Sequence, residues 1–223
     1  MLTSTHGLII VFQYSCARDS TTSPRRLPAG PLDLERAWNI FTRLVNINPS
    51  NVTVITDIRT DGIWRDAGHL HVLDTADILE VIPYLVSFRK RSAGCHLCFH
   101  FSGHGISMIR RGIYSHGLIL SGLGGTEERI LWERDLLWLL TDHGGPLPFL
   151  TIEGSRMIQG QRNLIALHYP ISLKSIPPPQ SLFCIFDCCY AGGLFKLPGV
   201  YNSKVQNIKK IGEETIPFPI VCL

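Results

Sequence analysis

The stretch SLFCIFDCCYAGG (181–193) is an apolar run that ends in an aspartate, two adjacent cysteines and two glycines. Its first part, residues 181–186, is short, rich in bulky apolar side chains and typical of a buried strand. Polar residues that follow such a strand lie at its carboxyl end, which is where ligands bind in open α/β sheets. The stretch therefore predicts a buried strand and puts two thiols where chemistry can occur.

Three further apolar runs have the same character, and helical patterns alternate with them. The expected strands are residues 7–14, 51–56, 96–102 and 181–186, and the expected helices are residues 31–45, 74–91 and 130–145. Pro31 suits the first turn of the first helix, Asp74 suits the N-cap of the second, and Pro83 kinks or shortens that helix. Strands that alternate with helices indicate an α/β three-layer sandwich, a mostly parallel sheet with helices on both faces.

The length and composition indicate one globular domain that spans residues 1–223. Hydrophobic residues make up 45% and charged residues 17% of the chain, which is typical of a folded protein with a substantial core. The net charge of +3, without a long Lys/Arg run, argues against nucleic-acid binding. No apolar run is long enough for a membrane span. The seven cysteines do not show the regular spacing of a disulfide framework. The N-terminus lacks the basic residues of a secretory signal peptide, so we expect a reduced cytoplasmic protein.

A histidine between two glycines follows the strand expected at 96–102, in the sequence FSGHG (101–105). A cysteine at the carboxyl end of a strand becomes a nucleophile when a neighbouring histidine or a helix N-terminus lowers its pKa. Glycines let the backbone turn tightly and bring amides near a reacting carbonyl group. From these residues we predict a Cys–His pair, with His104 as the acid/base and one cysteine of the 188–189 doublet as the nucleophile.

The segments FHFSGHG (99–105) and FDCCYAGG (186–193) resemble the two signature motifs of the caspase–metacaspase superfamily of cysteine peptidases. The similarity is closer to metacaspases, in which an aromatic-rich strand leads into S-G-H-G and a later strand into D-[SC]-C-x-[SA]-G. The caspase motif Q-A-C-x-G fits less well, because Asp187 stands where caspases have the glutamine. The resemblance follows the order of elements over residues 7–193 and implies a caspase-like fold and a cysteine-type endopeptidase.

The resemblance also chooses between the two cysteines. In the family the nucleophile lies two residues after the motif aspartate and three before the closing glycine, which is Cys189 here, and Cys188 takes a position held by serine or cysteine. Alternation along a strand turns the two thiols to opposite sides, so we expect Cys188 to serve packing. The resemblance further implies that His104 is the catalytic base and that the amides of Gly105 and Cys189 form the oxyanion hole.

The expected partners are protein or peptide substrates with arginine or lysine before the scissile bond, as the resemblance implies. Metacaspases bind that side chain with the motif aspartate and with the serine two before the histidine, which are Asp187 and Ser102 here. In metacaspases, a further aspartate of the same pocket ends a pattern like L-x-G-C-x-N-D at the start of the first helix. LPAGPLD (27–33) resembles it without the cysteine and asparagine, so Asp33 is the match. Carboxylates that face a guanidinium favour basic over acidic side chains.

Two regions depart from the family pattern. Residues 143–180 lengthen the connection between the motifs and are expected to be an insertion. Residues 194–223 form a short tail, so we expect the C-terminal strands of the sheet to be incomplete. No cofactor is predicted, although the family resemblance allows calcium. Within residues 115–135, between the motifs, the acidic residues are Glu127, Glu128, Glu133 and Asp135, which do not match the family's aspartates.

Two other functions compete with a peptidase. The first is a catalytically inactive or truncated homologue that acts as a binding or regulatory module, which the short tail favours. The second is a metal-binding interaction domain, because CHLCFH (95–100) contains two cysteines and two histidines. A strand would place Cys95 and Cys98 on opposite faces, and no second cysteine pair lies at zinc-ligand spacing. We therefore predict no metal site there. The sequence does not fix the oligomeric state.

Overall fold

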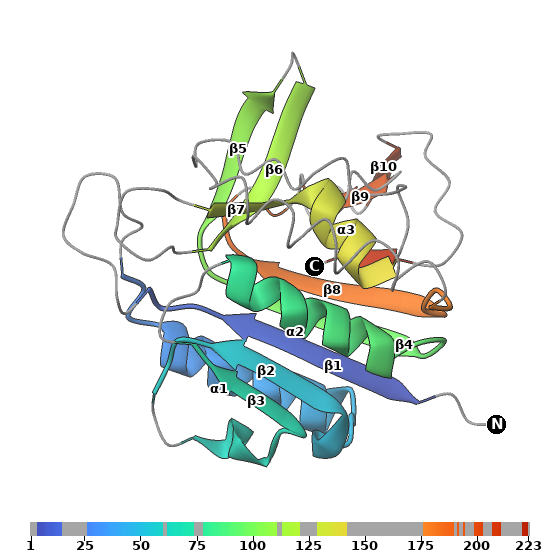
Figure 1. Cartoon of the computed structure of the whole chain (residues 1–223). Coiled ribbons are helices and arrows are strands. Elements are labelled where there is room, and N and C mark those ends of the chain that lie inside the picture. Colours follow the sequence, from blue (N-terminus) through green and yellow to red (C-terminus); the bar gives the residue numbers. More distant parts are fainter. Residues whose placement is uncertain are drawn as a thin grey trace, which may run out of the picture.

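The computed structural model describes most of the first 141 residues and a smaller part of the remainder. The described residues are 4–14, 26–59, 62–73, 78–110, 113–120, 129–141, 176–189, 191, 194, 199–202, 207–210 and 220–222. They contain one large sheet, two small sheets and three α-helices. Figure 1 shows the large sheet at the centre of the molecule, with helices on both sides of it.

The central sheet has six parallel strands in the order β11-β8-β4-β1-β2-β3. The strands are β1 (Thr5–Val11), β2 (Val52–Thr56), β3 (His69–Val72), β4 (His96–Ser102), β8 (Ser181–Asp187) and β11 (Ile220–Cys222). The inner strands are rich in β-branched and aromatic residues because both of their faces are covered. Since all strands run the same way, their carboxyl ends share one edge of the sheet.

Helices cover both faces of this sheet, and the alternation of side chains divides the core into two clusters. Helix α1 (Gly30–Asn39) packs on one face, in the cluster that contains Ile9. Helices α2 (Ile78–Arg91) and α3 (Glu133–Thr141) pack on the other face, in the cluster that contains Leu8. Adjacent strand residues thus enter different clusters, as a period of two requires. The result is a three-layer α/β sandwich, which confirms the expected fold class.

Helix α1 begins beside the end of β4. Pro31 lies in its first turn, where a missing N–H is tolerated, and Asp33 is favourable there because the helix N-terminus is partly positive. Ser102, the last residue of β4, donates a hydrogen bond to Asp33. A π-helical turn, Ile40–Leu44, continues α1. Short 3₁₀ helices occur at Pro49–Asn51 and Ile63–Asp66.

Two small antiparallel sheets accompany the central one. The first contains β5 (Gly105–Arg110), β6 (Ile113–Leu120) and β7 (Arg129–Trp132). The second pairs β9 (Gly199–Asn202) with β10 (Asn207–Lys210). Because β5 starts soon after β4 ends, the first small sheet rises beside the carboxyl edge of the central sheet (Figure 1).

The structure confirms the four expected strands and corrects the helices. β1, β2, β4 and β8 occupy the four apolar runs. The helix expected at 130–145 is wrong over residues 130–132, which belong to β7 because they pair with β6. The helix expected at 31–45 is α-helical only as far as Asn39. Pro83 lies inside α2, whereas Asp74 and residues 142–175 lie outside the described residues.

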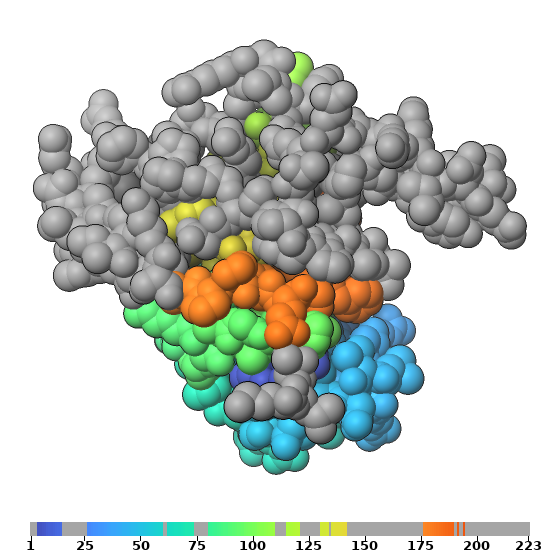
Figure 2. Space-filling view, turned by 90° about the vertical axis from the view of Figure 1, so that its right-hand side faces the viewer, coloured from blue at the N-terminus to red at the C-terminus, as the bar shows by residue number. Residues whose placement is uncertain are grey.

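Two strands that the sequence analysis did not predict form the edges of the central sheet. β3 ends it on one side, and β11 pairs in parallel with β8 on the other. The tail therefore contributes one short strand to the central sheet, in addition to the separate β9–β10 pair. Figure 2 views the edge at which the strands begin, where the orange segment that contains β8 lies against the green segment that contains β4. Among the described residues, no helix combines the length and apolarity needed to cross a lipid bilayer.

Candidate active site

The ends of β4 and β8 meet at the carboxyl edge of the central sheet. Their ladder ends with the pair Ser102–Asp187, and one more hydrogen bond joins the Gly103 N–H to the carbonyl oxygen of Asp187 at 3.2 Å. His104 follows β4 and the Cys188–Cys189 doublet follows β8, so the two segments emerge side by side (Figure 1). Two neighbouring strands thus bring residues that are far apart in the sequence to one edge.

Gly105 lies directly against the cysteine doublet. A Cβ atom at position 105 would lie 2.0 Å from the carbonyl oxygen of Cys189 and 3.2 Å from the Sγ atom of Cys188. The start of β5 therefore touches the backbone of the doublet, and only a glycine fits at this position. The residue that follows His104 in the chain is in contact with Cys189.

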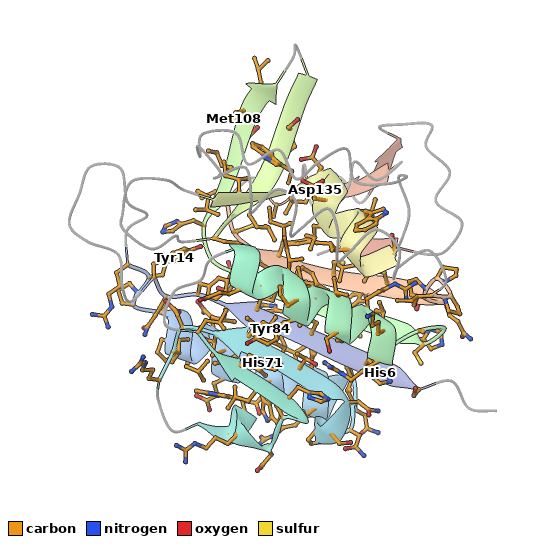
Figure 3. All side chains as sticks on the ribbon, in the orientation of Figure 1. His6, Tyr14, His71, Tyr84, Met108 and Asp135 are labelled. Carbon is orange, nitrogen blue, oxygen red and sulfur yellow. The ribbon has the colours of Figure 1, made fainter. Side chains whose placement is uncertain are left out.

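Tyr14 holds the backbone of His104. Its Oη atom accepts a hydrogen bond from the His104 N–H at 2.7 Å and donates one to the carbonyl oxygen of Ile119, also at 2.7 Å. The carbonyl oxygen of His104 accepts a bond from the Ile119 N–H at 2.9 Å. The ring centroids of Tyr14 and His104 lie 4.7 Å apart. Figure 3 shows Tyr14 beyond the end of β1. Sequence analysis missed Tyr14, because a tyrosine after a strand carries no distinguishing pattern.

The two cysteines of the doublet lie in different environments. Cys188 is half-buried and packs against the core cluster that α2 and α3 share. Burial, with the nearby charges of Cys189 and Asp187, raises the pKa of Cys188 to about 12, so its thiolate is disfavoured. Cys189 is exposed. The different placement of the two thiols agrees with the expectation that Cys188 serves packing.

An acidic cluster, Asp33, Ser102 and Asp187, lies at the same edge. The Ser102 Oγ atom donates a hydrogen bond to Asp33 Oδ2 at 3.2 Å, and Ser102 pairs with Asp187 in the ladder. Burial raises the pKa of Asp33, and the charge of Asp187 raises it further. The hydrogen bond from Ser102 and the charge of Arg36 oppose that shift. The three residues that the sequence pointed to are thus brought together from α1, β4 and β8.

His100 is a second residue of this region, which the sequence analysis weighed only as part of the CHLCFH motif. It lies in β4, two residues before Ser102, and is 5% exposed. Neither of its ring nitrogens has a hydrogen-bond partner among the described residues. Burial lowers the pKa of His100 to about 4, although the charge of Asp187 opposes the shift. A histidine inside an apolar strand was the available signal, because buried polar groups need partners.

The candidate metal ligands have other contacts. Glu133 is 3% exposed, and its Oε2 atom accepts a hydrogen bond from the N–H of His116 at 2.6 Å, which ties the start of α3 to β6. Glu127 and Glu128 lie outside the described residues. Cys98 packs in the core, and this burial raises the pKa of its thiol to about 11. The thiolate that a metal would need is therefore disfavoured. In the part of the chain that the structure describes, no three His, Cys, Asp or Glu side chains gather as a metal site would require.

Comparisons with known proteins show a distant structural similarity. No protein-family model matches the chain, and no curated protein sequence matches it significantly. Among solved structures, the chain resembles protein GSU0716 from Geobacter sulfurreducens, with 13% sequence identity and a TM-score of 0.45. The match covers 83% of this chain and 50% of the other, so this chain spans about half the length of that protein. The similarity identifies neither a family nor an activity.

Proposed function

We propose that this protein is a cysteine endopeptidase of the metacaspase type, with Cys189 as the nucleophile and His104 as the general base. The observation that carries the proposal is the contact of Gly105 with the carbonyl oxygen of Cys189. This contact brings together the segments that follow β4 and β8. The half-buried His104 directly precedes Gly105 in one segment, and the exposed Cys189 lies in the other. A nucleophile and a base in neighbouring segments are what covalent catalysis requires.

In the proposed reaction, His104 takes the proton of the Cys189 thiol and the sulfur attacks the carbonyl carbon of the scissile peptide bond. The carbonyl electron pair moves onto oxygen, and the amides of Gly105 and Cys189 donate hydrogen bonds to that oxyanion. When the C–N bond breaks, His104 gives its proton to the leaving amine. A thioester then joins the acyl part of the substrate to Cys189.

Hydrolysis of the thioester completes the cycle. His104, neutral again, takes a proton from a water molecule, and the resulting hydroxide attacks the thioester carbon. The C–S bond breaks, the Cys189 sulfur regains a proton from His104, and the carboxylic acid product leaves. Tyr14 supports both half-reactions, because its hydroxyl holds the His104 backbone in place.

The acidic cluster supports a preference for arginine or lysine before the scissile bond. Asp33 and Asp187 supply two carboxylates, and the described residue that forms an ion pair with Asp33 is Arg36, whose side chain is 66% exposed. Because Arg36 is largely exposed and its Nη1 atom lies 3.7 Å from Asp33 Oδ1, the pair is weak and can be displaced by a ligand. A basic side chain of the substrate would thus be attracted by two neighbouring carboxylates.

The test uses a fluorogenic peptide with arginine before the cleaved amide bond, with and without calcium. We expect Cys189→Ala and His104→Ala to lower kcat/KM by at least about 1,000-fold, because each removes a reacting group. Cys188→Ala is the matched control. It removes a thiol whose pKa is raised to about 12, so it should keep most of the activity. Circular dichroism of each variant would confirm that it is folded.

Equal rates for the wild type and Cys189→Ala would overturn the proposal. That result, together with binding of the uncleaved peptide, would favour the alternative of an inactive homologue that acts as a binding module. Activity that survives Cys189→Ala but is lost in Cys188→Ala would instead assign the reaction to the other thiol. A rate that depends on added calcium would show that the calcium allowed by the resemblance is required.

A further inference from the structure

His100 is a polar residue at the centre of an apolar strand. It pairs with Ile9 of β1 and Ile185 of β8, and both isoleucines belong to the core face that α1 covers. The imidazole is therefore on the same face of the sheet as α1, and 5% of the residue is exposed. Among the described residues, both of its ring nitrogens are without a hydrogen-bond partner.

A buried imidazole without a hydrogen-bond partner is unusual in a folded protein. A buried polar group without a hydrogen bond is unfavourable, and an apolar side chain of similar size would fit the face better. The pKa of His100 is lowered to about 4, so at neutral pH the ring is uncharged. A neutral imidazole has one nitrogen that donates and one that accepts. The ring can therefore accept a hydrogen bond from a ligand.

The acidic cluster lies directly beyond this ring. Residues two apart on a strand share a face, so Ser102 lies on the same face as His100, about 7 Å further along β4. In the ladder between β4 and β8, Ser102 pairs with Asp187 and His100 pairs with Ile185. Ser102 in turn holds the carboxylate of Asp33. The imidazole thus forms the inner end of a column of polar groups whose outer members are two carboxylates.

We propose that His100 is a specificity-determining residue that makes the acidic cluster select arginine over lysine. The proposal rests on the proposed function and names the substrate class of the same site. A guanidinium has five N–H donors in a rigid plane, whereas an ammonium has three donors around a point charge. The two carboxylates accept bonds from the outer edges of the guanidinium, and the neutral nitrogen of His100 accepts one from its inner edge.

The first experiment compares kcat/KM for two peptides that differ only in arginine or lysine before the scissile bond. We expect His100→Leu to reduce the arginine-to-lysine ratio about five- to tenfold, the worth of one hydrogen bond, while lysine cleavage continues. His100→Gln should restore most of the ratio, because its amide oxygen accepts in place of the imidazole nitrogen. Cys98→Ala, on the same face of β4, is the control and should leave the ratio unchanged.

The second experiment keeps His100 in place and does not need catalysis. In Cys189→Ala protein with ¹⁵N-labelled histidine, we expect Nα-acetyl-arginine amide to shift the ring nitrogen signals of His100. Nα-acetyl-lysine amide should leave them in place. Cleavage of basic peptides with an unchanged ratio in His100→Leu, and no ring shift, would overturn this inference alone. A ring shift without any peptidase activity would support the inference and overturn the proposed chemistry instead.

Discussion

At the scale of single residues, Tyr14 shows how local strain can serve the site. Its φ angle is 58°, in the left-handed region, which a bulky side chain seldom adopts. Such strain persists only where surrounding bonds determine the conformation, and it gathers at functional sites. The side chain is 1% exposed, and its hydroxyl joins the backbones of His104 and Ile119. The strained residue therefore fixes the segment that carries the proposed base.

The variant Tyr14→Phe keeps the ring and removes only the hydroxyl. We expect it to lose about 1–3 kcal/mol of folding stability, because the His104 N–H and the Ile119 carbonyl lose their partner. In peptidase assays kcat should fall while KM for arginyl peptides stays the same, since the acidic cluster is untouched. Urea unfolding and steady-state kinetics measure the two effects. An equal loss of stability without any fall in kcat would restrict Tyr14 to a structural role.

The residues of the site differ in how far the sequence could reveal them. Asp33, Ser102 and Asp187 stood out because they match a motif, and the structure brings them together. Tyr14 drew notice only in three dimensions, because its hydroxyl binds the peptide group of His104. His100 did so because both of its buried ring nitrogens are without a hydrogen-bond partner among the described residues. No spacing along the chain encodes either environment, so the roles of these two residues could not be predicted from the sequence.

At the scale of elements, the junction of β4, β5 and β8 depends on the absence of one side chain. We predict that Gly105→Ala lowers kcat/KM about 100-fold, because its methyl group would meet the carbonyl oxygen of Cys189 and displace one strand end. The same displacement should lower the thermal midpoint of unfolding. Steady-state assays and calorimetry on the purified variant check both effects.

Gly94→Ala is the matched control for that substitution. Gly94 has a φ of 70°, so alanine is strained there, but a Cβ atom would meet nothing within 4 Å. It should lose about 1 kcal/mol of stability and keep its activity. If Gly105→Ala behaves like Gly94→Ala, the contact between the strand ends has no part in the site.

The elements that the sequence predicted are those whose pattern is local. The runs that became β1, β2, β4 and β8 are short and rich in bulky apolar side chains, and that property is readable in a short window. Residues 130–132 have apolar spacing that suits a helix, yet β6 provides a partner and they pair as β7. β3, with the sequence HLHV, alternates polar and apolar residues over only four positions. Its pairing with β2 is a tertiary contact that no such window contains.

At the scale of the whole molecule, the fold lowers the pKa values of several histidines. His6 of β1 and His69 and His71 of β3 lie near enough to Arg91 of α2 for its charge to act on them. The ring of His71 stacks on Tyr84 of α2 at 3.9 Å (Figure 3). Burial lowers the pKa of each of the three histidines, and the positive charge of Arg91 lowers it further. Each therefore resists protonation while the chain is folded.

We predict that the free energy of unfolding falls as the pH is lowered from 7.5 to 5.5. A histidine with a lowered pKa binds its proton more readily in the unfolded chain, so its stabilising effect is complete above pH 6.5 and declines below it. His100, whose folded pKa is about 4, should alone account for about 1 kcal/mol of the loss by pH 5.5. Urea titrations followed by circular dichroism at the two pH values give the difference.

His100→Gln is the control for this pH dependence, because glutamine does not titrate. Its unfolding free energy should change less between pH 7.5 and 5.5 than that of the wild type. Asp33 acts in the opposite sense at lower pH, since its raised pKa favours the folded chain once the carboxyl group is protonated. Unfolding curves that coincide for the wild type at both pH values would contradict the prediction.

The position of β3 at the rim of the central sheet has a consequence for how copies of the molecule meet. A free strand edge is a template onto which another chain can add a strand, and natural proteins blunt such edges with short length and charge. β3 has four residues, two of them histidines. Because the fold lowers the pKa values of His69 and His71, this rim becomes cationic only in acid strong enough to overcome that shift. The same acid weakens the fold, so mutual repulsion of the rims would hinder fibre growth when the molecule is most vulnerable to it.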